Sequence, residues 1–137
     1  MNQDANVRWS WLRGMYIYTI AGAGMFGLGM LAVPEVIQSV FNWPVNEPIA
    51  FGVIGSVYLA FGLLSILGLR SPLKFVPLLV MQLCYKSIWL LGLLLPLVIR
   101  GQFPAYGITM VIIFATYIIG DLIAIPFSVV LAKEAER

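Results

Sequence analysis

The sequence predicts an all-α integral membrane protein in which four transmembrane helices form an antiparallel bundle. Of the 137 residues, 61% are hydrophobic and only 10% are charged, whereas about a quarter of the residues of a soluble domain are charged. Four apolar stretches are each long enough to cross a hydrocarbon core of about 30 Å, which needs about 20 helical residues. The basic residues gather at the ends of these stretches that would share one membrane face.

The whole chain, residues 1–137, is predicted to be a single domain with spans at residues 15–33, 49–69, 73–99 and 106–131. The last two spans exceed the minimal length, so we expect them to tilt or to extend beyond the hydrocarbon. A cleaved signal peptide is the alternative for the first span, because Arg8 and Arg13 precede its apolar run. That run is longer than a usual signal core and no small-residue cleavage site ends it, so we interpret it as a retained span.

The segment between the first two spans predicts a short amphipathic helix that lies in the outer interface. Pro34 suits a helix start and Pro44 a helix stop. The apolar and polar side chains fall on opposite helical faces, with Val36, Ile37, Val40 and Phe41 on one and Glu35, Gln38, Ser39 and Asn42 on the other. An anchoring loop without helical structure is the alternative.

The distribution of basic residues predicts the orientation of the chain. One side of a hairpin topology holds six of them: Arg8, Arg13, Arg70, Lys74, Lys133 and Arg137. The opposite side holds only Arg100, together with Glu35 and Glu47. Because cytoplasmic loops carry an excess of Lys and Arg, both termini are predicted to be cytoplasmic in a plasma membrane, the bacterial inner membrane.

Several classes of site are disfavoured by composition. The chain has no histidine, a single cysteine and a net charge of +2. Haem, zinc and iron–sulfur sites depend on those missing residues, so we expect no metal and no resident cofactor, with a bound lipid or quinone as the alternative. Nucleic acid is not an expected partner. The expected partner is the lipid bilayer, and further possible partners are a second copy of the chain, another membrane protein or a lipophilic small molecule.

Glycine-rich stretches in the first two spans predict close helix packing. Residues 22–27 match the dinucleotide fingerprint G-x-G-x-x-G, but no strand precedes them, so the match is rejected. Ala23 and Gly27 form one pair of small residues four apart, and Gly52, Ser56 and Ala60 form a longer row. Small residues let backbones approach in lipid. A ligand groove lined by glycine is the alternative.

One lysine and one aspartate lie far from any span end. Burying either alone costs about 2.5–3.5 kcal/mol on insertion scales. Counted from Phe103 in the turn between the last two spans, Lys86 lies 17 residues earlier (103 − 86) and Asp121 lies 18 residues later (121 − 103). Antiparallel neighbouring helices would bring them to one depth, so the sequence predicts that Lys86 and Asp121 form a buried pair.

Polar and aromatic side chains, predicted on the same helical stripes as the pair or at its depth, complete a candidate ligand or proton site, with no catalytic residue among them. The members of this site are Lys86, Asp121, Tyr117, Gln82, Trp89, Ser56 and Tyr58. Glu35 is a candidate gate on the outer side, and the alternative for it is a solvated carboxylate in a first helical turn.

The overall pattern resembles the DoxX-like superfamily of small four-helix bacterial membrane proteins. The resemblance is carried by the glycine-rich first span, by Pro34 and Glu35 with the amphipathic segment that follows, and by Gly52–Ser56. It implies a small inner-membrane protein whose relatives act as quinone-linked redox partners, accessory subunits or assembly factors. The chain is also similar to the four-helix family of sterol isomerases and sigma-2-type receptors, which use membrane-embedded carboxylates. Asp121 would fit that family and Lys86 departs from it.

Two functions follow from these observations. The first is a non-enzymatic accessory or assembly module in which the Lys86–Asp121 pair and the glycine rows support association. The alternative is a protein that binds or transports a lipophilic ligand or a proton at a polar site in the bundle centre. Intramembrane ionisable residues are functional by default, but a matched pair can also serve only to hold two helices in register.

Overall fold

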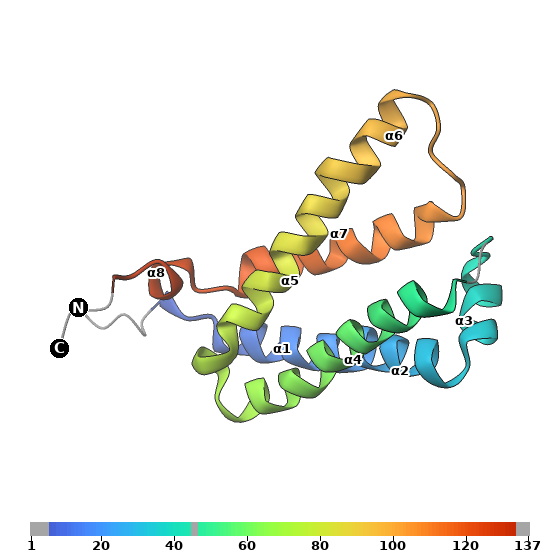
Figure 1. Cartoon of the computed structure of the whole chain (residues 1–137). Coiled ribbons are helices and arrows are strands. Elements are labelled where there is room, and N and C mark those ends of the chain that lie inside the picture. Colours follow the sequence, from blue (N-terminus) through green and yellow to red (C-terminus); the bar gives the residue numbers. More distant parts are fainter. Residues whose placement is uncertain (1–5, 45–46, 134–137) are drawn as a thin grey trace.

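In the computed structural model, which describes residues 6–44 and 47–133, the chain is helical along most of its length (Figure 1). Four helical segments are long and apolar enough to cross a membrane, namely Trp9–Ala32, Pro48–Arg70, Pro72–Ile99 and Gly107–Ala124. The prediction of four apolar spans is confirmed by this length and composition. Arg137, predicted to lie with the other basic residues, falls outside the described residues.

Two of the four segments contain a π-helical turn. The first segment comprises α1 (Trp9–Thr19), a π-helical turn (Ile20–Gly24) and α2 (Met25–Ala32). The third comprises a 3₁₀ turn (Pro72–Phe75), α5 (Val76–Trp89), a π-helical turn (Leu90–Leu94) and α6 (Leu95–Ile99). The remaining helices are α3 (Pro34–Phe41), α4 (Pro48–Arg70), α7 (Gly107–Ala124) and α8 (Phe127–Val130).

Prolines and polar caps set several helix starts. Pro34 and Pro48 begin α3 and α4 at a position where the missing N–H removes no intrahelical bond. The carboxylate of Glu47 accepts hydrogen bonds from the backbone N–H groups of Ile49 and Ala50, which caps α4.

A short helix was predicted for the segment between the first two spans, and α3 confirms it. The alternative of a loop without helical structure is wrong.

The fourth span is shorter than predicted. The sequence suggested a helix to Leu131, but α7 ends at Ala124, and Ile125 is extended with ψ 121°. Pro126 explains the difference, because it disfavours helical geometry at the preceding residue and cannot donate a backbone hydrogen bond. The short α8 follows this break.

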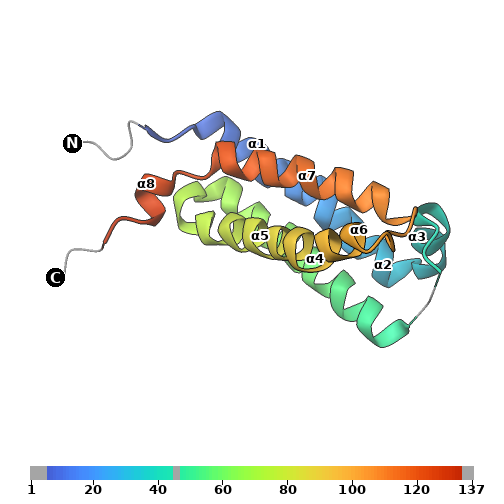
Figure 2. The ribbon, with the colours of Figure 1, turned by 90° about the horizontal axis from the view of Figure 1, so that it is seen from above.

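The chain reverses direction between successive long segments (Figures 1 and 2). Helix α4 packs along α1 and α2, and α7 packs against α1 and α5. The start of α1, the α4–α5 connection and α8 lie at one end, which we call the basic end because Arg8, Arg13, Arg70, Lys74 and Lys133 belong to these segments. Helix α3 and the α6–α7 connection lie at the opposite end, which we call the α3 end. Towards that end α6 leans away from α7 (Figure 1).

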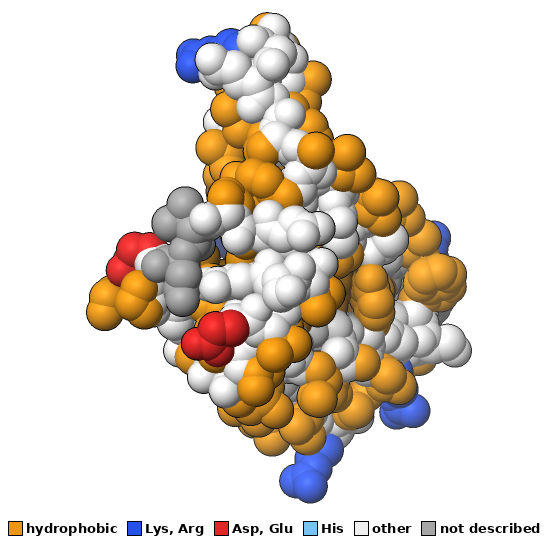
Figure 3. Space-filling model, turned by 90° about the vertical axis from the view of Figure 1, so that its right-hand side faces the viewer, with side chains coloured by type: hydrophobic (Ala, Val, Ile, Leu, Met, Phe, Trp, Pro, Cys, Tyr) orange, Lys and Arg blue, Asp and Glu red, His pale blue; other side chains and the backbone are white. Residues whose placement is uncertain are grey.

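The two ends differ in the chemistry of their surfaces. Figure 3 views the α3 end, where hydrophobic side chains spread over the flanks, a basic group lies at the projecting tip and acidic groups lie to one side. Glu35 and Glu47 are exposed in or next to the helices of this end, and Arg100 is exposed after α6. Polar side chains at the ends and apolar side chains on the flanks are typical of a helical membrane protein.

The packed core lies closer to the basic end. Its largest buried members come from α1, α5 and α7, and they include Leu12, Met15, Tyr16, Leu79 and Tyr117. The hydroxyl of Tyr16 donates a hydrogen bond of 2.7 Å to the carbonyl of Pro72, which ties α1 to the α4–α5 connection. The hydrogen bond and the apolar packing thus fix the positions of α1, α5 and α7 near the basic end.

Glycines allow the first segment and α4 to approach to backbone contact. A Cβ atom on Gly62 would overlap the backbone of Gly24, and one on Gly27 would overlap the backbone of Leu59 and Gly55. Backbones at this distance gain dispersion contacts that compensate for the missing hydrophobic driving force in lipid. Gly27 therefore has the predicted packing role, and the helix that it packs against is α4 of the same chain.

The predicted row of Gly52, Ser56 and Ala60 is not the face of α4 that makes this contact. Nothing lies within 4 Å of a Cβ placed on Gly52, and Ser56 and Ala60 are exposed. The face that packs instead carries Gly55 and Gly62, since the glycines of the first segment select the α4 face that can come closest. The row therefore lies on the outer surface of the bundle.

We expect Gly62→Val to lower the free energy of unfolding by about 1–3 kcal/mol, because the added side chain would force α4 away from Gly24. Thermal unfolding of the purified protein in detergent measures the change. Gly52→Ala is the matched control on the same helix. It should leave the midpoint unchanged or raise it, since there is space for the methyl group and alanine favours helix by about 1 kcal/mol. Equal midpoints for the two variants would contradict this packing.

Candidate functional site

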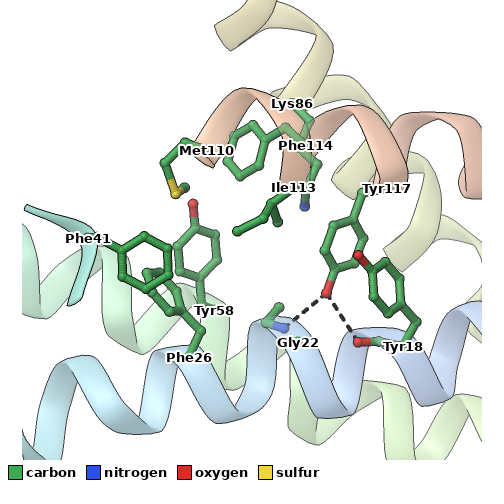
Figure 4. A pocket seen from close by; sticks show the side chains of 11 residues that line it. Tyr18, Gly22, Phe26, Phe41, Tyr58, Lys86, Met110, Ile113, Phe114 and Tyr117 are labelled. Carbon is green, nitrogen blue, oxygen red and sulfur yellow. Dashed lines mark hydrogen bonds between the residues drawn. The ribbon is translucent and has the colours of Figure 1, made fainter. Parts of the chain in front are cut away.

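A cavity of about 300 Å³ lies among the helices, and we call it the lysine cavity (Figure 4). Ligand sites in proteins usually occupy about 300–1,000 Å³. The lining is aromatic and aliphatic apart from one charged group. It comprises Tyr18, Gly22, Ala23, Phe26, Phe41, Tyr58, Lys86, Met110, Ile113, Phe114 and Tyr117. The cavity is thus formed by all four long segments together with α3.

Lys86 is buried, with 1% of its surface exposed, and its ammonium lies among aromatic rings. The Nζ atom is 4.3 Å from the ring centroid of Tyr85, 4.3 Å from that of Tyr117 and 5.1 Å from that of Phe114. It also donates a hydrogen bond of 2.5 Å to the Tyr85 hydroxyl. A cation within about 6 Å of a ring face is attracted by the ring quadrupole, by about 2 kcal/mol or more when desolvated. We call these three rings the aromatic cage.

The hydroxyl of Tyr117 is inserted into the hydrogen-bond ladder of the first helical segment. It donates to the carbonyl of Tyr18 at 3.1 Å and accepts from the N–H of Ala23 at 3.0 Å. These two backbone groups are five residues apart, within and beside the π-helical turn Ile20–Gly24. Insertion of a side chain into the ladder is a recognised cause of local helix distortion. The Tyr117 hydroxyl therefore provides hydrogen-bond partners for the two backbone groups, and they provide partners for the hydroxyl.

Gly22 provides the space for this contact. A Cβ atom at this position would overlap the hydroxyl of Tyr117. The Tyr117 ring also stacks on Tyr18, with ring centroids 4.3 Å apart. Figure 4 shows the two rings side by side above the first segment, with the Lys86 nitrogen pointing into the cavity next to Tyr117. Gly22 thus has a role at the cavity wall and none in a dinucleotide motif.

Asp121 is fully buried but does not form an ion pair with Lys86. Its Oδ2 atom accepts a hydrogen bond of 3.4 Å from Nε2 of Gln82, and its Oδ1 atom has no hydrogen-bond partner in the described part of the chain. The Oε1 atom of Gln82 in turn lies 3.3 Å from the hydroxyl of Thr19. The predicted direct pair is therefore wrong in its geometry, because Gln82 binds the carboxylate and the aromatic cage holds the ammonium.

Both charges are buried, but the contacts place them about one helical turn apart along the bundle and not at the single depth that the sequence predicted. Lys86 touches the ring of Tyr117, and Asp121 follows Tyr117 by one turn on α7. Gln82, Lys86, Tyr117 and Asp121 are all buried. They form one polar cluster with two parts. The part made by Thr19, Gln82 and Asp121 links α1, α5 and α7, and the part made by Lys86 and its cage faces the lysine cavity.

Tyr58 and Trp89 line a second cavity of about 420 Å³ between α4, α5–α6 and α7, which we call the wedge cavity. Trp89 packs edge-on against Phe114, with ring centroids 5.0 Å apart. Tyr58, Met110 and Phe114 line both cavities. The structure therefore places these two predicted residues beside Lys86, on the side of the bundle where α6 leans away.

Ser56 and Glu35 do not join the site. Ser56 is exposed, and its hydroxyl donates a hydrogen bond to the carbonyl of Gly52 one turn earlier. Glu35 is exposed in the first turn of α3 and lines neither the lysine cavity nor the wedge cavity. Glu35 thus has the first-turn position of the alternative, and its role as a gate stays a prediction.

Sequence reasoning missed several members of the site. Tyr85, Tyr18 and Phe114 were not predicted, although they hold the ammonium or shape the wall around it. One signal was available, because Tyr85 precedes the intramembrane lysine directly. The others depend on the rotation of helices about their axes, which the apolar pattern of a fully hydrophobic helix does not indicate.

Neither a protein-family model, a curated protein nor a solved structure matches this chain. Function must therefore be argued from the geometry of the cavities and of the buried polar groups. The resemblances noted in the sequence stay predictions.

We expect Tyr117→Phe to lower the free energy of unfolding by about 1–3 kcal/mol, because it leaves backbone groups of Tyr18 and Ala23 without a buried partner. Hydrogen exchange of the Ala23 amide should also accelerate. Tyr18→Phe is the control, since the Tyr18 hydroxyl bonds to the exposed Thr116, which has a second partner in the carbonyl of Ile113. A Tyr117→Phe protein as stable as the control would show that the inserted hydroxyl is not needed.

Proposed function

We propose that this chain is a multi-pass membrane protein that binds a lipophilic small molecule in the lysine cavity. The observation that supports this most strongly is the position of Lys86, whose ammonium lies at the wall of an apolar cavity and is held by ring faces. Pockets with mainly apolar and aromatic linings and a few placed polar groups are the usual form of small-molecule sites. The charged group would orient the ligand and the rings would contact its apolar body.

A binding role explains Lys86 better than a purely structural ion pair does. Two charges buried for structural reasons compensate for their desolvation by direct contact and by additional hydrogen bonds. Here Gln82 bonds to Asp121, and the ammonium bonds to the Tyr85 hydroxyl and points into the cavity (Figure 4). The cation is therefore desolvated and available to a ligand, as expected of an intramembrane ionisable residue with a function.

The proposal includes an orientation in the membrane. The basic end carries exposed Arg8, Arg13, Arg70 and Lys74, whereas the described basic residue at the α3 end is Arg100. We propose that the four helices span the bacterial inner membrane as an antiparallel bundle, with the basic end in the cytoplasm. The lysine cavity would then lie in the hydrocarbon region, and ligands would reach it from the bilayer.

Association with a second copy or with another membrane protein is a second candidate function. It is favoured by the row of Gly52, Ser56 and Ala60, which lies on the outer face of α4 with open space beside Gly52. Rows of small residues four apart are common at interfaces between transmembrane helices. In this function the chain would serve as an accessory or assembly module, with or without a bound ligand.

Native mass spectrometry of the protein released from mild detergent tests both candidates, because it reports bound small molecules and subunit number together. We expect the wild-type protein to retain a non-covalent hydrophobic adduct. Ile113→Trp should lose that adduct, since the larger side chain would fill the lysine cavity. The matched control is Ile112→Trp, because the neighbouring Ile112 is 60% exposed on the outer surface.

An adduct that survives Ile113→Trp, or a wild-type protein without any adduct after extraction from membranes, would contradict ligand binding in this cavity. A dimer or larger assembly that is lost on Ala60→Leu would support the second candidate. A monomer under conditions that preserve other membrane oligomers would count against it.

A further inference from the structure

We infer that the ligand of the lysine cavity is a single-chain amphiphile with a carboxylate head, that is, a fatty acid anion. This inference rests on the proposed function and specifies its ligand. Lys86 is the charged side chain that lines the lysine cavity, and neither this cavity nor the wedge cavity is lined by Asp or Glu within the described residues. A ligand group that complements this site is an anion.

The membrane environment makes the head group decisive. Hydrocarbon tails are as apolar as the leucines of a helical bundle, so moving an acyl chain from the bilayer into a cavity gains little. The difference between ligands therefore arises at Lys86. Its ammonium is already desolvated, and a charge-assisted hydrogen bond from it to a carboxylate is stronger than one to a neutral oxygen. A cationic head would be repelled by the same group.

A carboxylate suits the depth of the site better than a phosphate does. Lys86 lies inside the helical bundle, near the middle of the continuous stretch formed by α5 and the π-helical turn Leu90–Leu94. A group that must enter hydrocarbon avoids a large desolvation penalty when it can become neutral. A carboxylic acid becomes neutral by taking up one proton, whereas a phosphodiester keeps its charge. A fatty acid can therefore enter the hydrocarbon region as the neutral acid, which a phosphodiester lipid cannot do.

The two cavities together provide a path for one acyl chain. The lysine cavity of about 300 Å³ and the wedge cavity of about 420 Å³ share Tyr58, Met110 and Phe114 as lining residues. Beyond them, leucines of the third segment line the wedge cavity, including Leu94 and Leu97. The chain would run from Lys86 past Tyr58 to the region where α6 leans away from α7.

Equilibrium binding of radiolabelled palmitate to the detergent-solubilised protein tests the inference. Unlabelled hexadecanol and hexadecyltrimethylammonium, which have the same chain with a neutral and a cationic head, serve as competitors. We expect palmitate to compete at least about tenfold better than hexadecanol, because a hydrogen bond to a charged group contributes on the order of tenfold or more. Hexadecyltrimethylammonium should compete weakest. This comparison uses the wild-type protein and depends on no variant.

Variants then assign the effect to Lys86. Lys86→Met should weaken palmitate binding about tenfold and leave hexadecanol binding unchanged, whereas Lys86→Arg keeps the cation and should retain the preference for palmitate. Ile112→Trp should bind both as the wild type does. If hexadecanol competes as well as palmitate and Ile113→Trp blocks both, the anion is wrong and the cavity as a binding site stands. If neither molecule binds in a manner sensitive to Ile113→Trp, the proposed function itself is contradicted.

Discussion

The hydroxyl of Tyr117, held between the carbonyl of Tyr18 and the N–H of Ala23, is the contact on which the site depends. In hydrocarbon no water can satisfy backbone groups freed by a helix distortion, so a protein group must do so. Tyr117 satisfies the π-helical turn of the first segment and, through the same contact, sets how α7 sits against α1. The Nζ atom of Lys86 lies over the ring of Tyr117, 4.3 Å from its centroid. The side chain of Tyr117 thus takes part in the π-helical turn, in the contact between α1 and α7 and in the site of Lys86.

The buried polar groups are divided between two tasks. Thr19, Gln82 and Asp121 hold α1, α5 and α7 together through side-chain contacts in the packed half of the bundle. Lys86 takes no part in that chain of contacts and faces the lysine cavity instead. The packed half lies near the basic end, where Tyr16 also bonds to Pro72. The other half lies near the α3 end, where α6 leans away from α7 and the wedge cavity forms.

Much of this fold could be predicted from sequence because it follows from local patterns. Apolar length predicted the spans, and Pro34 with an amphipathic pattern predicted α3. Counting residues on either side of a turn predicted that Lys86 and Asp121 lie at one depth. Both are buried with Gln82 and Tyr117, but their contacts place them about one helical turn apart. The rotation of uniformly apolar helices about their own axes was not predicted correctly. The sequence prediction placed Ser56 inward, although the face of α4 with Gly55 and Gly62 packs instead. It also paired Lys86 with Asp121, although aromatic rings from α5 and α7 hold the ammonium.

Lys86 is held by aromatic side chains, and we propose that it is left available to a ligand. Nuclear magnetic resonance of the protein with ¹³C-labelled lysine tests it most directly. The chain has three lysines, and Lys74 and Lys133 are exposed. We expect the ε-methylene protons of Lys86 to resonate well upfield of the other two, because they are bonded to the carbon next to Nζ, which lies over the ring of Tyr117 at 4.3 Å from its centroid. A Lys86 signal that coincides with those of Lys74 and Lys133 would contradict the aromatic cage and the site built on it.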